Sequence, residues 1–121
     1  MKSDNENVIV VKNKAFALRL IKLYKYLIEE KREHVLSKQF LRSATSIGAN
    51  VREAIRGQSD ADFGAKMNIS LKEASETEYW LELLQESEYI SHDKGEEMLA
   101  DCKELIRILM AIVKTSFEKN K

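Results

Sequence analysis

The chain has 121 residues, 44% of them hydrophobic and 33% charged, with 20 basic and 20 acidic residues. This composition is typical of one globular domain and excludes a disordered chain. The absence of proline and the presence of only four glycines favour helices, while one cysteine and two histidines exclude a disulfide scaffold and the usual zinc clusters.

Residues 1–12 are predicted to form an N-terminal arm. Residues 2–7 lack the basic start and long apolar stretch of a signal peptide, and the longest apolar run, Ile108 to Val113, is too short to cross a bilayer. We therefore expect a cytoplasmic protein that does not enter a membrane. The β-branched run Val8–Val11 is either a first helical turn or an extended arm that makes an assembly contact.

Two helical patterns follow in the first half of the chain. The first runs from about residue 13 to 30, with apolar residues every three or four positions from Phe16 to Leu27. The second runs from about residue 35 to 56. Gly48 lies inside it, where glycine costs about 1 kcal/mol relative to alanine, so we expect a neighbouring helix to approach closely there. The expected core stripe of this helix is Leu36, Phe40, Ala44, Ile47, Val51 and Ile55.

Two further helices are predicted in the second half. The third covers about residues 61–86 after the capping residues Ser59 and Asp60, and the fourth runs from the cap Ser91 to about Phe117. The third has a coiled-coil-like seam of Phe63, Met67, Ser70, Ala74, Thr77, Leu81 and Leu84. Short loops between such helices predict an all-α fold: an antiparallel up-down-up-down four-helix bundle over residues 13–118, with a C-terminal tail at 119–121.

The third and fourth helices have apolar residues on more than one side. On the fourth they cover about 160° of the helical wheel, which is wider than a bundle core requires. This surplus predicts a second layer of packing and hence a homo-oligomer. The candidate interface residues are Ile69, Trp80, Leu83, Met110 and Phe117.

No group of residues in the sequence predicts catalysis. His34 and His92 are far apart and lack the paired spacing of a metal site. Cys102 lies on the core face of the fourth helix, as an unreactive buried thiol does. A di-iron bundle needs Glu-x-x-His pairs, and no glutamate here has a histidine three residues later. We therefore expect no enzyme, no metal and no cofactor.

A polar stripe runs beside the core stripe of the second helix and faces carboxylates of the third. The prediction is a structural network that fixes how the two helices align, with Arg42 paired to Glu73 or Glu76. The alternative is a binding site. The residues concerned are Arg42, Ser46, Asn50, Glu53, Glu73 and Glu76.

Charge is unevenly distributed along the chain. Residues 1–57 carry 12 basic and 6 acidic residues, residues 58–90 carry 2 and 8, and residues 91–121 carry 6 and 6. This segregation suits helices that attract each other, or a basic surface for nucleic acid. The basic residues on outward faces are Lys12, Lys14, Arg19, Lys22, Lys25, Lys38, Arg52 and Arg56. The RNA- or DNA-binding candidates among them are Lys22, Lys25, Lys38, Arg52 and Arg56.

The second helix also has the spacing of a DNA-binding helix-turn-helix, with Ala44, Gly48 and Val51 in the positions of the motif core. The motif requires a turn at Gly48. The apolar stripe passes through Gly48 without losing its helical phase, which favours one continuous helix. The helix-turn-helix stays open as an alternative.

Two segments of the chain resemble a known family. Residues 41–54 read LRSATSIGANVREA and residues 72–81 read KEASETEYWL, with Phe63 between them and Tyr89-Ile90 after them. Over roughly residues 13 to 115 the chain resembles the bacterial four-helix-bundle family, also called the 23S rRNA intervening-sequence protein family and labelled a ribosomal protein. The resemblance implies a ring-like assembly, most simply a pentamer. It also implies a distant likeness in fold to the accessory variability protein of retroelements, which binds nucleic acid and a reverse transcriptase. It implies no catalytic residue.

The functional hypothesis is thus a non-enzymatic homo-oligomeric bundle that binds RNA or DNA through its basic helix faces. One alternative is a protein–protein adaptor with no affinity for nucleic acid. The other is the helix-turn-helix regulator.

Overall fold

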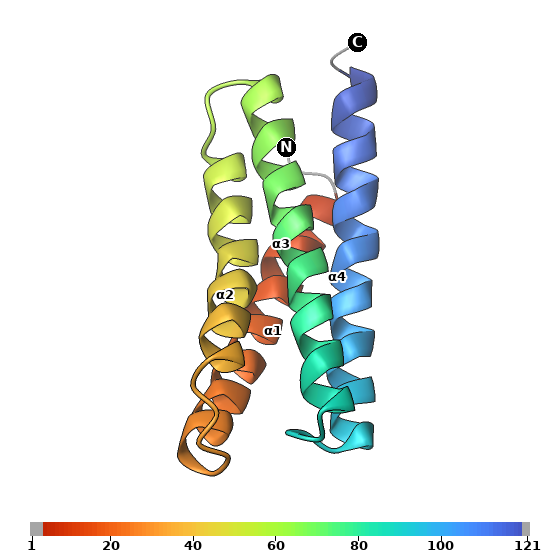
Figure 1. Ribbon diagram of the computed structural model, residues 1–121. Coiled ribbons are helices and arrows are strands. Elements are labelled where there is room, and N and C mark those ends of the chain that lie inside the picture. Colours follow the sequence, from red (N-terminus) through yellow and green to blue (C-terminus); the bar gives the residue numbers. More distant parts are fainter. Residues whose placement is uncertain (1–3, 120–121) are drawn as a thin grey trace.

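The computed structural model describes residues 4–119, which form four α-helices and no strand (Figure 1). The α1–α2 and α3–α4 loops lie at one end of the bundle, and the α2–α3 loop lies at the other, so successive helices are antiparallel. The predicted all-α four-helix fold is confirmed, whereas its assembly into a ring stays a prediction. The helices are α1 (Asp4–Glu29), α2 (Leu36–Ile55), α3 (Asp60–Glu86) and α4 (His92–Lys119).

The N-terminal arm is the largest departure from the prediction. Residues 4–12 are helical and continue directly into the rest of α1, so the separate arm is wrong there, and residues 1–3 lie outside the described residues. Ile9 is fully buried in the core while Val11 is 69% exposed. The run Val8–Val11 is thus the helical alternative of the prediction. Because helical periodicity sends its members to different faces, one of them is buried while another is exposed. At the other end Lys119 belongs to α4, and residues 120–121 are not described.

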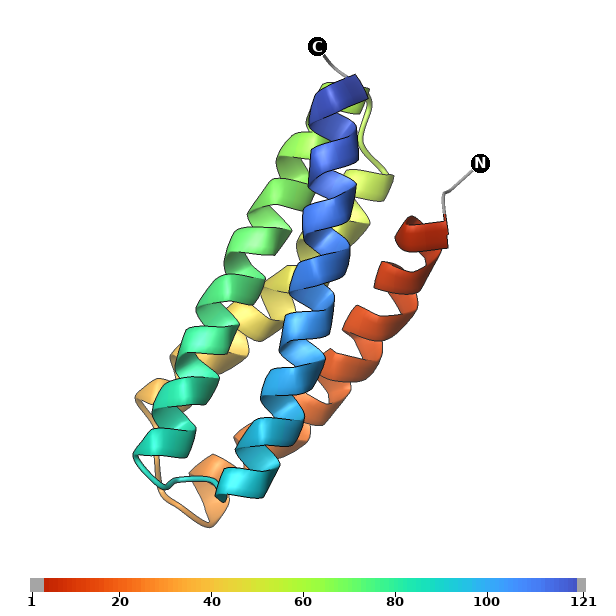
Figure 2. The same ribbon diagram turned by 90° about the vertical axis from the view of Figure 1, so that its right-hand side faces the viewer.

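The four helices surround one apolar core, and each helix packs against its two neighbours in the order α1, α2, α3, α4 and back to α1. Figure 2 views the bundle with α4 in front, and α1 and α3 flank it. The predicted seam of α3 is buried from Met67 to Leu84, with Phe63 half-buried at its start. The largest fully buried side chains include Phe16, Leu20, Leu27, Phe40, Ile47, Met67, Leu81, Leu84, Met98, Leu105 and Leu109.

Serine caps begin α3 and α4, as predicted. The Ser59 hydroxyl accepts a hydrogen bond from the backbone N–H of Asp62 at 3.0 Å, and the Ser91 hydroxyl accepts one from the N–H of Lys94 at 3.1 Å. These caps fix where two of the three interhelical loops end.

The start of α2 is capped differently, by the buried carboxylate of Glu33. It accepts hydrogen bonds from the N–H groups of Val35, Leu36 and Ser37 at 3.2, 3.1 and 2.7 Å. Burial alone would raise the pKa of Glu33, but the hydrogen bonds from Ser37, Leu36 and Val35 outweigh it and hold that pKa below its ordinary value. One carboxylate thus satisfies three of the orphan donors that begin every helix.

Within residues 4–119, no helix combines the length and the apolarity needed to cross a bilayer.

Candidate nucleic-acid interface

Arg42 joins α2 to two successive turns of α3. Its Nη1 donates to Glu73 Oε2 at 3.0 Å and its Nη2 donates to Glu76 Oε2 at 2.6 Å. Trp80 Nε1 donates to the other oxygen of Glu76 at 3.2 Å. The hydrogen bond from Arg42 is the main reason that the pKa of Glu76 is lowered. The guanidinium therefore bridges α2 and α3 in the pairing that the sequence predicted.

The remaining members of the predicted stripe do not join this cluster. The Ser46 hydroxyl donates to the Arg42 carbonyl oxygen at 2.7 Å, and Asn50 Nδ2 donates to the Ser46 carbonyl oxygen at 2.8 Å, so both bond their own helix. Glu53 lies 3.5 Å from the ammonium of Lys66 on α3. The six residues thus form one interhelical clamp, two local hydrogen bonds and one separate ion pair.

An open groove of about 1090 Å³ follows the α1–α2 seam and continues round the α2–α3 loop. We call it the α1–α2 groove. Its floor includes the small residues Ala17, Gly48 and Ala49. Four basic and two acidic side chains line it: Lys14, Arg52, Arg56, Lys66, Glu53 and Asp62.

Gly48 accounts for the close contact of α1 and α2 at this groove. A Cβ at position 48 would overlap Oδ1 of Asn13, a residue of α1 that is 8% exposed. Asn13 is held there because its Nδ2 donates to the carbonyl oxygens of Ile9 at 2.6 Å and Val10 at 3.2 Å. The expected close approach of a neighbouring helix at Gly48 is confirmed.

The helix-turn-helix alternative is wrong, because α2 is one helix from Leu36 to Ile55 and continues through Gly48. Without a turn at that position, residues 50–55 do not begin a separate recognition helix.

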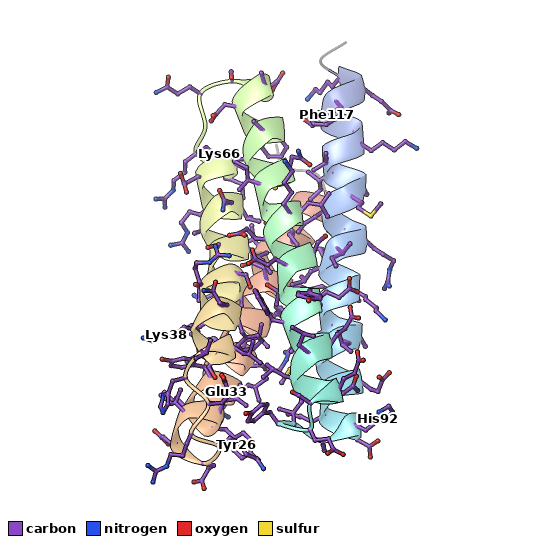
Figure 3. All side chains as sticks on the ribbon, viewed as in Figure 1. Tyr26, Glu33, Lys38, Lys66, His92 and Phe117 are labelled. Carbon is purple, nitrogen blue, oxygen red and sulfur yellow. The ribbon has the colours of Figure 1, made fainter. Side chains whose placement is uncertain are left out.

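The five candidate nucleic-acid residues lie in three places. Arg52 and Arg56 line the α1–α2 groove, whereas Lys22 lines a different hollow between α1 and α4. Lys25 and Lys38 are exposed and line neither. Figure 3 shows Lys38 toward the end of the bundle formed by the α1–α2 loop and Lys66 toward the opposite end. Among the described residues none of the five forms an ion pair with an acidic side chain.

Three other basic residues differ from the sequence prediction: two that were expected to be free on outward faces form ion pairs, and one that was not predicted lines the groove. Lys12 and Arg19 are neutralised by Glu104 at 3.0 Å and Asp101 at 2.8 Å, which ties α1 to α4. Lys66 lines the α1–α2 groove although it belongs to residues 58–90, the acidic part of the sequence. The net charge of that segment therefore could not predict a basic residue at the groove. The packing of three helices at this end of the bundle places Lys66 on the same groove as Arg52.

The groups that could carry chemistry are dispersed. Within residues 4–119, histidine, cysteine, aspartate and glutamate side chains nowhere gather in a set that would hold a metal ion. Cys102 is fully buried, and chiefly its desolvation raises the pKa of its thiol to about 12. Its S–H donates to the Ala74 carbonyl oxygen at 3.3 Å, so this thiol has a packing role.

The candidate interface residues differ in exposure. Met110 and Phe117 on α4 are 55% and 51% exposed, and Ile69 on α3 is 42% exposed. Trp80 and Leu83 are half-buried, and the Trp80 ring packs against an adjacent tyrosine of α3. Figure 3 places Phe117 at the end of the bundle where α2 and α3 are joined. Apolar surface is therefore present on both α3 and α4.

Comparisons with known proteins agree with this fold. The profile of the 23S rRNA-intervening sequence protein family matches residues 5–111. The chain is 53% identical to a protein of unknown function from the S23 ribosomal protein family of Bacteroides thetaiotaomicron VPI-5482, known from a 1.70 Å crystal structure. That match covers 91% of this chain and 98% of the other, with a TM-score of 0.89. No curated protein matches. The chain belongs to the 23S rRNA-intervening sequence protein family.

Proposed function

We propose that this chain is a non-enzymatic helical scaffold of the cytoplasm that assembles with copies of itself and binds RNA or DNA through the α1–α2 groove. The observation that carries the proposal is the groove itself, where Arg52, Arg56 and Lys14 stand over a floor of small residues. The family name, which refers to a sequence within 23S rRNA, makes structured RNA the first ligand to test.

The charge of the groove supports contact with a phosphodiester backbone. Arg52 of α2 and Arg56, which caps the C-terminus of that helix, are four residues apart and exposed, and neither is paired with a described carboxylate. An arginine fork that is not already paired is available for two oxygens of one phosphate. Glu53 and Asp62 reduce the net positive charge, so we expect moderate affinity that depends strongly on salt.

The exposed apolar residues of α3 and α4 support self-assembly. Met110 and Phe117 are spaced by two helical turns and more than half exposed, and a lone bundle gains nothing from leaving them in water. We propose a closed ring, most simply a pentamer, in which symmetry repeats the α1–α2 groove around the assembly. Repetition then multiplies the modest charge of one groove.

The binding proposal is tested by titrating labelled structured RNA with the protein across a salt series. We expect Arg52→Gln and Arg56→Gln together to weaken binding about tenfold or more and to lower the salt slope by about 1 per arginine. Arg107→Gln, an exposed arginine of α4 outside the groove, is the matched control and leaves affinity unchanged. Absence of binding even at low salt contradicts the proposal, because phosphate contacts are strongest there.

The assembly proposal is tested by light scattering. A ring has a mass several times the 14.0 kDa of one chain, five times for a pentamer, and Met110→Lys with Phe117→Ser lowers it. A mass of one chain at micromolar concentration contradicts assembly.

A second candidate is a protein–protein adaptor without affinity for nucleic acid. It is favoured by Val11 and Leu18, which are 69% and 57% exposed and lie two turns apart on the outer face of α1. The same RNA titration separates the two functions. Val11→Ser with Leu18→Ser leaves RNA binding intact if the groove proposal holds.

A further inference from the structure

A second hollow lies between α1 and the start of α4, and nothing in the function proposed above uses it. We call it the α1–α4 crevice. It measures about 450 Å³, within the usual size range of small-molecule sites. Three cationic side chains line it: Arg19 and Lys22 from α1, and Lys94 from the first turn of α4.

The cations of the crevice are only partly neutralised. Nη2 of Arg19 donates to Asp101 at 2.8 Å, and Lys94 lies 3.7 Å from Glu97. Lys22 is exposed and forms no ion pair with a described residue. Arg19 Nε is a buried side-chain donor without a hydrogen-bond partner among the described residues, which is rare in proteins. An anionic ligand in the crevice would meet the unpaired ammonium of Lys22 and the ammonium of Lys94, whose contact with Glu97 is long and exposed.

The rest of the lining is apolar and aromatic. Leu23, Ile90 and Met98 are buried and form the floor. Tyr26 is 42% exposed and forms part of the wall, with the ammonium of Lys31 6.0 Å from the centre of its ring. An exposed tyrosine beside apolar side chains offers a face on which a planar ring can stack.

The crevice is separate from the α1–α2 groove. Figure 3 shows Tyr26 near the end of the bundle that holds the α1–α2 and α3–α4 loops, whereas Lys66 of the groove lies toward the opposite end. No residue lines both hollows. A ligand of the crevice can therefore be studied without blocking the groove.

We propose that the α1–α4 crevice binds a nucleoside monophosphate unit. The base stacks on Tyr26 over the apolar floor, and the phosphate lies between Lys22 and Lys94. This combination distinguishes the ligand from an inorganic anion, which gains nothing from the floor, and from a neutral aromatic compound, which gains nothing from the cations. The unit is a free nucleotide or one nucleotide of an RNA strand, because both present a base and a phosphate.

The first experiment is calorimetric titration of the full chain with AMP, adenosine and inorganic phosphate. We expect AMP to bind more tightly than either part alone. Tyr26→Ala weakens AMP binding at least about fivefold, while Tyr26→Phe retains it, because stacking needs the ring and not the hydroxyl. Lys22→Gln removes the preference for AMP over adenosine. Lys103→Gln, an exposed lysine of α4 outside the crevice, is the matched control.

A short single-stranded RNA, titrated in parallel, distinguishes the source of the nucleotide. Binding of AMP that depends on Tyr26 identifies a free nucleotide, and binding of the RNA alone that depends on Tyr26 identifies a nucleotide within a strand. If Tyr26→Ala and Lys22→Gln change neither affinity, or if phosphate binds as well as AMP, the proposal is overturned. The groove function stands or falls separately, because it depends on Arg52 and Arg56.

Discussion

The two sides of the bundle are packed differently. On one side α3 meets its neighbours through small buried residues, and hydrogen bonds cross between helices. Ser70 Oγ donates to the Ile47 carbonyl oxygen of α2 at 2.8 Å, and Thr77 Oγ1 donates to Ser43 Oγ at 2.9 Å. Small side chains let the helix axes approach closely along these seams.

On the other side α1 approaches α2 closely at Gly48, contributes large side chains to the core and meets α4 through exposed charges. Phe16 and Leu20 fill the core, and exposed ion pairs such as Lys12 with Glu104 connect α1 to α4. In Figure 1 α1 runs obliquely behind the other three helices. Both hollows border this helix. The difference teaches that the α1–α2 groove and the α1–α4 crevice both follow from how α1 packs against its neighbours.

The difference in packing between the two sides is tested most strongly by placing the same substitution, alanine to leucine, on each side. Ala74 is fully buried on α3, so Ala74→Leu overpacks the core, and we expect the free energy of unfolding to fall by about 3 kcal/mol. Ala17→Leu enters the α1–α2 groove, where Ala17 is half-buried and open space is available, and costs less than about 0.5 kcal/mol. Urea denaturation measures both. Equal losses would show that the α1 seams are packed as tightly as those of α3.

In the loop between α1 and α2, one carboxylate caps the start of α2. We expect Glu33→Ala to lower the free energy of unfolding by about 2 kcal/mol, because three backbone donors lose a charged acceptor at once. Ser59→Ala, which removes the single cap bond of α3, is the matched control and costs about 1 kcal/mol. An equal cost for the two caps would contradict the role given to Glu33.

Glu33 also makes stability depend on pH in the acidic range. Its pKa is lower in the folded chain than in the unfolded chain, so the stabilisation is fully present above the unfolded pKa and is lost as pH falls through the folded pKa. Glu33→Gln should flatten that part of the stability profile measured by thermal unfolding. The slope that remains belongs to groups such as Glu76, whose pKa is lowered by Arg42.

The sequence predicted those parts of the fold that follow from helical periodicity. The stripe through Phe40, Ile47 and Val51 and the seam of α3 identified most of two buried faces. The polar stripes of α2 and α3 also predicted Arg42 opposite Glu73 and Glu76, because two helices joined by a short loop have few possible registers.

Helical periodicity did not predict three features of the structure: the first turns of α1, the cap of α2 and the α1–α4 crevice. The β-branched run at residues 8–11 concealed the first turns of α1, since such residues have lower helix propensity and only tertiary contact of Ile9 with the core offsets it. Glutamate is not a preferred N-cap residue, so the sequence did not predict that Glu33 caps the start of α2. The α1–α4 crevice depends on the packing of α1 against α4, and periodicity within one helix does not reveal it.

A smaller effect tests why α1 approaches α2 closely at Gly48. Alanine normally stabilises a helix interior by about 1 kcal/mol relative to glycine, but the position of its Cβ at residue 48 is occupied by Asn13. We expect Gly48→Ala to give no gain in the native background and a gain of about 1 kcal/mol in the Asn13→Ala background. A double-mutant cycle by urea denaturation measures the coupling. Additive effects would show that Asn13 does not set the approach of α1.

The smallest difference is expected between the ion pairs of the two sides. Arg42 bonds two carboxylates, one of which, Glu73, is only 17% exposed, whereas Lys12 makes a single contact with Glu104 and both partners are about two-fifths exposed. Exposed pairs contribute little, so we expect Lys12→Met to cost about 0.3 kcal/mol. Arg42→Met should cost about 1 kcal/mol, because it also leaves two neighbouring carboxylates without a counter-ion on α3. Urea denaturation measures the free energy of unfolding of both variants. Repeating it in 1 M salt should remove most of the difference between their costs, because salt screens the charges. A difference that persists in salt would mean that the packing of the Arg42 side chain, and not its charge, holds α2 against α3.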